Sequence, residues 1–283
     1  MAILSTLRTE TYDILNELVT SNVYSSTYID QLINDEHVEV CAMRKWQFLR
    51  KKFLFEAPIN TTLSTALTTA STEVVCAAVT NFDSAGAIYI DQDVIDYTAI
   101  STLTLTTASN IDLSHAAGAE IRPLKSVPSD YGKQPEMSVM RTNSSSIVRF
   151  EYVNEYEYED STISRKFTVL VDSGGDEFIL TNGLVSGDQV IFKYLKTPTT
   201  LSSDSDVSSI PDQWAIKVIP KLVAWKAMYT RNDDLEGLGS KIRMLAEMEL
   251  QKMMKYYGDR EHGASKIIKS AYSSNVTDIL PNK

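Results

Sequence analysis

The chain has few of the residues that build metal, redox and catalytic sites. Its 283 residues include two cysteines, and Cys41 and Cys76 lie too far apart to match a zinc or redox motif. His37, His115 and His262 fall in three separate stretches, none with a second histidine or cysteine at ligand spacing. We therefore expect no metal, no cofactor and two buried free thiols, with a single disulfide left as the alternative.

Long apolar runs and known catalytic motifs are also missing. No stretch approaches the roughly 20 apolar residues of a membrane span. The first residues show no basic segment followed by an apolar one, so no signal peptide is predicted. Walker, G-x-S-x-G, H-E-x-x-H and dinucleotide-binding glycine motifs do not occur. These absences predict a protein without catalytic residues that is made in the cytoplasm and does not enter a membrane.

Basic residues are scarce and unevenly placed. The chain carries 27 Lys and Arg against 37 Asp and Glu, a net charge of −10, and no basic residue lies between Lys52 and Arg122. Residues 53–210 sum to −12, whereas residues 211–283 sum to +3. Proteins that grip nucleic acid by its phosphates cluster Lys and Arg, so this distribution excludes that class.

Helical periodicity marks the two ends of the chain. Apolar residues recur at spacings of three and four over 5–18 and again from Ile29, after candidate caps at 25–27, to an expected end near Lys45 or Trp46. The helical spacing of apolar residues resumes after Pro211, and Pro220 should kink this helix or start a new one. A last helix should end at Gly258. The side chains expected in the core of this helical domain are Trp46, Trp214, Leu222 and Trp225.

The middle of the chain has the composition of β-strands. A hairpin is predicted from Ala87–Ile90 and Val94–Tyr97 around a turn at 91–93. Further strands are predicted at 147–152, 165–171, 178–180 and 189–195. The pattern is therefore α+β, and its simplest arrangement packs the terminal helix pairs together with the β region inserted between them.

The acidic and tyrosine-rich run 151–160 allows three interpretations. Read as a strand, it puts Glu155, Glu157 and Glu159 on one face and Tyr156 with Tyr158 on the other. The acids could form the carboxylate pair of a glycan-cleaving enzyme. The tyrosines, with Tyr152, could stack on sugars. A solvated strand edge is the third interpretation and the favoured one, because a ladder of acids on one face offers no distinct environments for an acid and a base.

Several segments together resemble the head-to-tail connector, or adaptor, proteins of tailed bacteriophages, the short-tailed type above all. The likeness spans roughly residues 5–257 and is less clear over 122–190. The segments that carry it are Leu7–Leu15, Tyr28–Asn34 closing on Trp46–Leu49, Ile88–Thr98 with His115–Gly118, and Phe192–Leu195 leading through Leu201 and Ile210–Asp212 to Trp225 and Tyr229.

The resemblance implies an α+β fold with a helical-bundle domain built from the N- and C-terminal helices, a large inserted β region and an extended C-terminal tail. The expected bounds are 1–56 and 201–258 for the two halves of the helical domain, 57–200 for the β region (as modules 57–125 and 136–197), and 259–283 for the tail.

The resemblance also implies a structural virion protein rather than an enzyme. Family members form a ring of about twelve copies at the neck of the virion, below the portal protein. The ring extends the channel for double-stranded DNA, without sequence-specific binding, and gives tail proteins such as a nozzle or tail tube their attachment surface. The C-terminal tail would bind the portal, with apolar anchors and charge partners at Lys266, Ile267, Ile268, Lys269 and Tyr272. The alternatives are a tail completion or nozzle protein and a carbohydrate- or receptor-binding β module of the phage tail.

Overall fold

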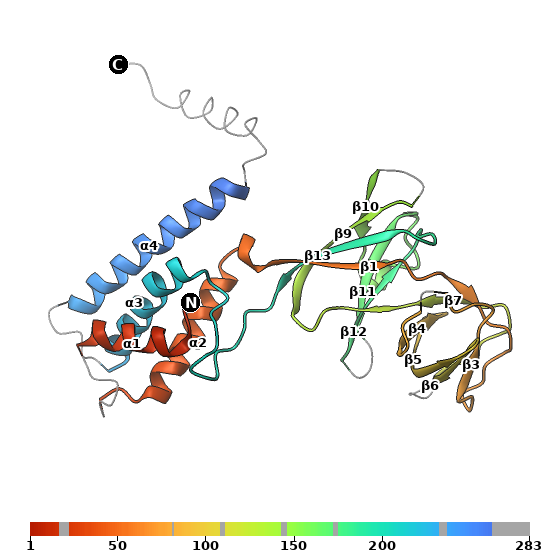
Figure 1. Cartoon of the computed structure of the whole chain (residues 1–283), viewed down its shortest axis with the longest axis horizontal. Coiled ribbons are helices and arrows are strands. Elements are labelled where there is room, and N and C mark those ends of the chain that lie inside the picture. The colour runs from red at the N-terminus through yellow and green to blue at the C-terminus, as the bar shows by residue number, and fades with distance from the viewer. Residues whose placement is uncertain are drawn as a thin grey trace, which may run out of the picture. The chain divides into compact units, whose positions relative to one another are not determined.

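The computed structural model describes residues 1–16, 23–80, 82–107, 111–142, 146–171, 175–231 and 237–261. The described chain is mixed α+β, with four α-helices and two sheets, so the predicted α+β class is confirmed. It divides into two compact units, which we call the helical unit (residues 1–50 and 197–283) and the β unit (51–196). Figure 1 shows the elements of each.

Both ends of the chain contribute to the helical unit. Its helices are α1 (Leu4–Leu15), α2 (Ser26–Ala42), α3 (Asp212–Arg231) and α4 (Leu238–Glu261). Helix α3 contacts each of the other three. The side chains buried between them include Leu7, Tyr12, Ile33, Val218, Leu222 and Ala246.

Helix boundaries differ from the predicted ones at three places. Helix α2 ends at Ala42, earlier than expected, and the chain turns back so that Trp46 donates its indole N–H to the Val40 carbonyl at 2.6 Å. Helix α3 continues through Pro220, without a restart, and α4 continues through Gly258. Pro220 is buried in α3, and next to Gly258 in α4 the Tyr257 ring contacts Trp46. Such packing offsets the roughly 1 kcal/mol by which a glycine destabilises a helix relative to alanine.

The first turn of α1 is bound by the segment that leads into α3. The Leu4 and Ser5 amides donate to the carbonyls of Asp206 and Asp204 at 3.0 and 3.3 Å. Ile3 offers no side-chain cap, so these carbonyls satisfy amides that a helix N-terminus otherwise leaves free. One turn further on, the Arg8 guanidinium binds both carboxylate oxygens of Asp30 and one of Asp204.

Helix α2 binds the same segment through two side chains. The Asn34 amide donates to the Leu201 carbonyl and accepts from the Leu201 amide, both at 2.8 Å. The buried His37 accepts from the Ser209 amide at 3.0 Å through Nε2. His37 thus helps to hold α2 against a backbone segment 172 residues further along the chain.

The first sheet of the β unit has six strands in the order β2-β7-β4-β5-β6-β3. They are β2 (Thr61–Thr62), β3 (Glu73–Val75), β4 (Gly86–Ile90), β5 (Asp93–Ser101), β6 (Thr104–Thr107) and β7 (Glu120–Pro123). The predicted hairpin is confirmed, because β4 and β5 pair antiparallel around Asp91 and Gln92. Both turn residues have positive φ, 45° and 74°, as a two-residue hairpin turn of this twist requires.

The second sheet has seven strands in the order β1-β13-β9-β10-β11-β12-β8. They are β1 (Arg50–Glu56), β8 (Lys125–Ser126), β9 (Tyr131–Met140), β10 (Ile147–Tyr152), β11 (Lys166–Val171), β12 (Glu177–Thr181) and β13 (Gln189–Lys196). The four strands predicted here are confirmed. Strands β1 and β9 were not predicted: β1 opens with three exposed cations, and β9 contains glycine and proline, so neither shows a clear alternation.

The two sheets meet over a small apolar core. Ala87 and Tyr89 of β4 pack with Leu170 of β11 and Leu180 of β12, and Leu124 lies between β7 and β8. The loop after β10 closes this core with Tyr158. The junction therefore brings residues of one sheet next to a loop of the other.

Replacing Arg8 tests how strongly the two chain ends are joined. Its side chain is only 15% exposed, so Arg8→Ala leaves two carboxylates without their cation. We expect the helical unit to lose roughly 2 kcal/mol of unfolding free energy. Urea unfolding followed by tryptophan fluorescence reports on this unit, because Trp46, Trp214 and Trp225 all belong to it.

The matched control is Lys252→Ala, which breaks an exposed pair with Glu249 on α4. Its effect should stay below about 0.5 kcal/mol. Equal stabilities for the two variants would contradict the role given to Arg8.

Candidate functional site

The residues predicted for the helical core differ in burial. Trp46 and Leu222 are buried, whereas Trp214 and Trp225 are half-buried and lie at helix surfaces rather than in the core. Trp225 lines a cleft of about 430 Å³ between α3 and α4, where the Arg243 guanidinium lies 4.5 Å from its ring. The predicted portal-binding residues Lys266, Ile267, Ile268, Lys269 and Tyr272 lie outside the described residues.

The predicted strand over 151–160 is wrong. Strand β10 ends at Tyr152, and Asn154 caps a short 3₁₀ helix at Glu155–Glu157 by accepting from the Tyr156 amide. Lys166 then draws the chain inward, since its ammonium group binds the carbonyls of Tyr158 and Ser161.

The tyrosines of this run therefore do not share a face. Tyr156 is 90% exposed, whereas Tyr158 is 1% exposed and belongs to the core between the sheets. The 3₁₀ turn also breaks the ladder of acids, and Glu159 lines a cleft. A change of backbone direction at Asn154 was not visible in the alternation of acids and tyrosines.

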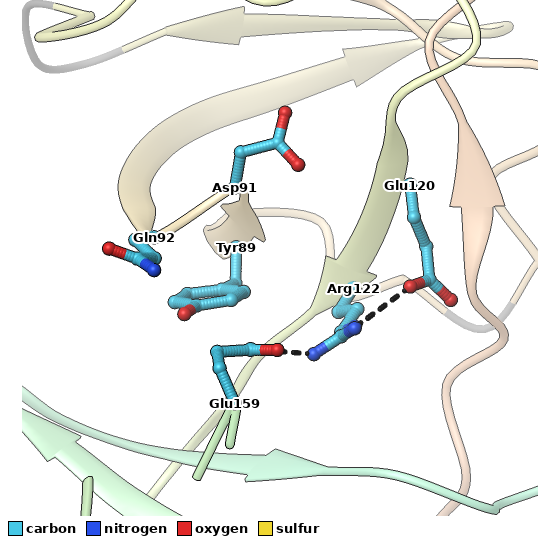
Figure 2. Close-up of a pocket in the computed structure, with 6 residues that line it drawn as sticks. All are labelled: Tyr89, Asp91, Gln92, Glu120, Arg122 and Glu159. Atoms are coloured by element: carbon cyan, nitrogen blue, oxygen red, sulfur yellow. Dashed lines mark hydrogen bonds and ion pairs between the residues drawn. The ribbon is translucent and has the colours of Figure 1, made fainter. Parts of the chain in front are cut away.

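A cleft lies at the junction of the two sheets of the β unit. It encloses about 250 Å³ and is lined by Tyr89, Asp91, Gln92, Glu120, Arg122 and Glu159. Figure 2 shows Tyr89 in the middle, with Asp91 and Gln92 from the hairpin turn on one side. Glu120 and Arg122 come from β7, and Glu159 comes from the loop of the other sheet.

Arg122 links the two sheets across the cleft. Its Nη1 donates to Glu159 at 2.9 Å, and its Nε donates to Glu120 at 3.0 Å (Figure 2). The guanidinium carbon also lies 5.9 Å from the centre of the Tyr89 ring. Both carboxylates are thus engaged by one cation, and an acid–base pair working on a glycan would first have to break this bridge.

Ionisation is disfavoured for Tyr89 of the cleft lining and for Tyr158 of the core between the sheets. Burial, with Glu159 as the next cause, raises the pKa of Tyr89 to about 12. Burial also raises the pKa of Tyr158, while the charge of Arg122 opposes that shift and the charge of Glu159 adds to it. The buried Tyr158 hydroxyl has no hydrogen-bond partner among the described residues.

A buried histidine holds the hairpin turn beside the cleft. His115 Nδ1 lies 3.3 Å from an Asp91 carboxylate oxygen, and Nε2 lies 3.2 Å from one of Asp93. Asp93 also accepts from the Leu113 amide, so the turn is tied to the 111–119 loop. The contact brings the segments 88–98 and 115–118 against each other in the fold.

The remaining reactive side chains to consider are the two cysteines. Cys41 and Cys76 are buried thiols that form no disulfide, and burial raises the pKa of Cys76 to about 11. Among the residues that the structure describes, no three His, Cys, Asp or Glu side chains gather as metal ligands. In the same residues, no helix is both long and apolar enough to cross a membrane.

Comparison with known proteins does not place the chain in a family. No model of a protein family matches it, and no curated protein is significantly similar in sequence.

The raised pKa of Tyr89 predicts a loss of stability at alkaline pH. In the unfolded chain this hydroxyl ionises near pH 10, whereas in the folded chain it stays protonated to about pH 12. Its contribution is therefore complete below pH 10 and is lost as the pH rises toward about 12. Urea unfolding followed by far-ultraviolet circular dichroism at about pH 9 and about pH 11 should show this loss.

Tyr89→Phe should reduce the difference between the two pH values, and Tyr156→Phe is the matched control at an exposed position. An unchanged difference in Tyr89→Phe would contradict the prediction.

Proposed function

We propose that the protein is a head-to-tail adaptor of a tailed bacteriophage virion. In this proposal the four helices form the helical-bundle domain of the adaptor, into which the β region is inserted. About twelve copies form a ring under the portal protein, extend the DNA channel and offer an attachment surface to tail proteins. The protein works by assembly and carries out no catalysis.

The observation that carries the proposal is the joining of the two chain ends in one helical unit. The described residues of 1–50 and 197–261 belong to one compact unit, and residues 51–196, which lie between them in the chain, belong to the other. This organisation agrees with the one that the resemblance implies. It fits an adaptor better than a free-standing carbohydrate-binding module, which would need no second domain closed around its ends.

Charge supports the same assignment. Residues 53–210 sum to −12, and such a surface repels DNA, which must slide through a channel rather than adhere to it. The C-terminal part from residue 211 sums to +3 and leads into the tail expected to bind the portal.

A glycan-binding module remains the alternative that one observation favours. Tyr152 is 50% exposed and Tyr156 is 90% exposed, so two aromatic rings are available for stacking on sugars. The burial of Tyr158 removes the third ring that this interpretation invoked. A glycan array probed with wild-type protein and with Tyr156→Ala tests it directly.

The adaptor proposal predicts that portal binding depends on the last residues of the chain. Removing residues 262–283 leaves all four helices at full length and should abolish co-sedimentation with portal rings. Ile268→Asp should weaken binding at least about tenfold, because a charge in a desolvated anchor position costs more than one hydrogen bond. Asn275→Asp adds the same charge at a polar position and is the matched control.

Electron microscopy of the assembled particle gives the second readout, since rings of such proteins can form on the portal alone. Persistent failure of the full-length protein to join portal rings in any assembly condition would count decisively against the adaptor role.

A further inference from the structure

Helix α4 carries apolar side chains on two of its sides. Ile242 and Ala246 belong to the buried side, which packs within the helical unit. On the outer side Met244, Leu245 and Met248 are 56%, 48% and 47% exposed. Spacings of three and four residues place these three side chains next to one another on the helix surface. An exposed patch of large apolar side chains marks an interaction surface.

Three exposed lysines border this patch. Lys241 lies one turn before it, and Lys252 and Lys255 lie one and two turns after it. Lys252 forms an exposed pair with Glu249, whereas Lys241 and Lys255 have no ion-pair partner among the described residues. We call the three apolar side chains and their three lysines the α4 face.

The apolar surface continues from the α4 face onto α3. Met244 lines the cleft of about 430 Å³ together with Trp225 and Tyr229, and Tyr229 is 68% exposed. Glu247 also lines this cleft, but it is paired with Arg243 on the same helix. The positive charge of the lysines is therefore not cancelled by this neighbouring acid.

The outer side of α2 carries the opposite charge. Two acids and two smaller apolar residues lie there at spacings of three and four, and all four are exposed: Asp35, Val38, Glu39 and Ala42. Neither acid makes an ion pair with a described residue. Lys226 of α3 binds the carboxylate of the buried Glu36 at 2.6 Å instead. We call these four residues the α2 face.

The two faces complement each other, and neither complements itself. Two α4 faces in contact would bring lysines together, and two α2 faces would bring carboxylates together, so like charges disfavour a two-fold contact of either kind. An α4 face on an α2 face pairs opposite charges and covers exposed apolar groups on both. Helix α3 contacts both α2 and α4 (Figure 1), and no ion pair joins the two faces within the described part of one chain.

We propose that the α4 face of one copy of this chain binds the α2 face of a second copy. The lysines of the α4 face pair with Asp35 and Glu39. Its apolar side chains pack on Val38 and Ala42. Because each copy presents both faces, the contact repeats from copy to copy and can close into a ring. The inference rests on the proposed function, since it names the surfaces through which neighbouring copies of the ring meet.

The first test is cysteine cross-linking of the full-length chain with a short bismaleimide, both free and bound to portal rings. A chain that carries Val38→Cys together with Met248→Cys should form a ladder of linked multimers on a denaturing gel. Either variant alone should stay unlinked, and a mixture of the two single variants should stop at the dimer. The native Cys41 and Cys76 are buried and should contribute little background.

The second test exchanges the charges of the two faces. Lys241→Glu with Lys255→Glu makes the α4 face acidic, and Asp35→Lys with Glu39→Lys makes the α2 face basic. Each double variant alone brings like charges together, so self-association followed by sedimentation velocity should weaken at least roughly tenfold. An equimolar mixture of the two should recover, because every face then finds a face of opposite charge on the other variant.

The matched control is Asp13→Lys with Glu73→Lys, which makes the same change of net charge at exposed positions outside both faces. It should leave self-association unaltered. The cysteine variants replace only exposed side chains, so they decide the question if a charge-exchanged chain fails to fold by circular dichroism.

Three results would overturn the proposed contact. The first is the absence of linked multimers in both the free and the portal-bound protein. The second is linkage through Val38→Cys alone, which would show a two-fold contact. The third is a mixture of charge-exchanged variants that associates no better than its components. Portal binding without linked multimers would overturn this contact and leave the adaptor role intact, whereas linked multimers that never join portal rings would do the reverse.

Discussion

The helical unit depends on the closure of a very long loop. Residues 51–196 separate its two halves, so the chain entropy of bringing the ends together must be offset by contacts between them. Arg8 supplies one such contact by binding Asp30 of α2 and Asp204 of the segment before α3. Asn34 and His37 supply two more by binding the backbone of that segment. The shared core of α1, α2 and α3 can form only where these polar contacts set the register of the two chain ends.

A similar constraint shapes the β unit, where the loop between β10 and β11 of one sheet contacts the other sheet. Lys166 binds two carbonyls of the 153–165 loop, and this fixes Tyr158 in the core and Glu159 at the surface beside Arg122. The cleft exists because that loop meets β7 and the hairpin turn of the other sheet. Its charge follows from a composition almost without cations, and its shape follows from the loop.

Regular patterns in the sequence predicted regular structure well. The spacing of apolar residues identified four helices, and alternating apolar residues identified the hairpin and the strands between 147 and 195. The prediction failed where a polar side chain redirected the chain. Asn154 ended a strand that the alternation of acids and tyrosines extended to residue 160, and β9, with a glycine and a proline, had no pattern to recognise. Gly258 did not end α4, because neighbouring tyrosines pack against Trp46 and Trp214.

The sequence by itself determined the α+β class, the acidic middle with its single arginine between residues 61 and 123, and the lack of a recognisable catalytic motif. These follow from composition and periodicity, which are local properties of the chain. The tertiary structure alone decided that Tyr158 is buried while Tyr156 is exposed, and that Glu159 meets Arg122 from another sheet. It also decided that His115 lies between Asp91 and Asp93. Each of these depends on contacts between residues far apart in sequence, and such contacts are set by packing and loop closure rather than by any neighbouring pattern.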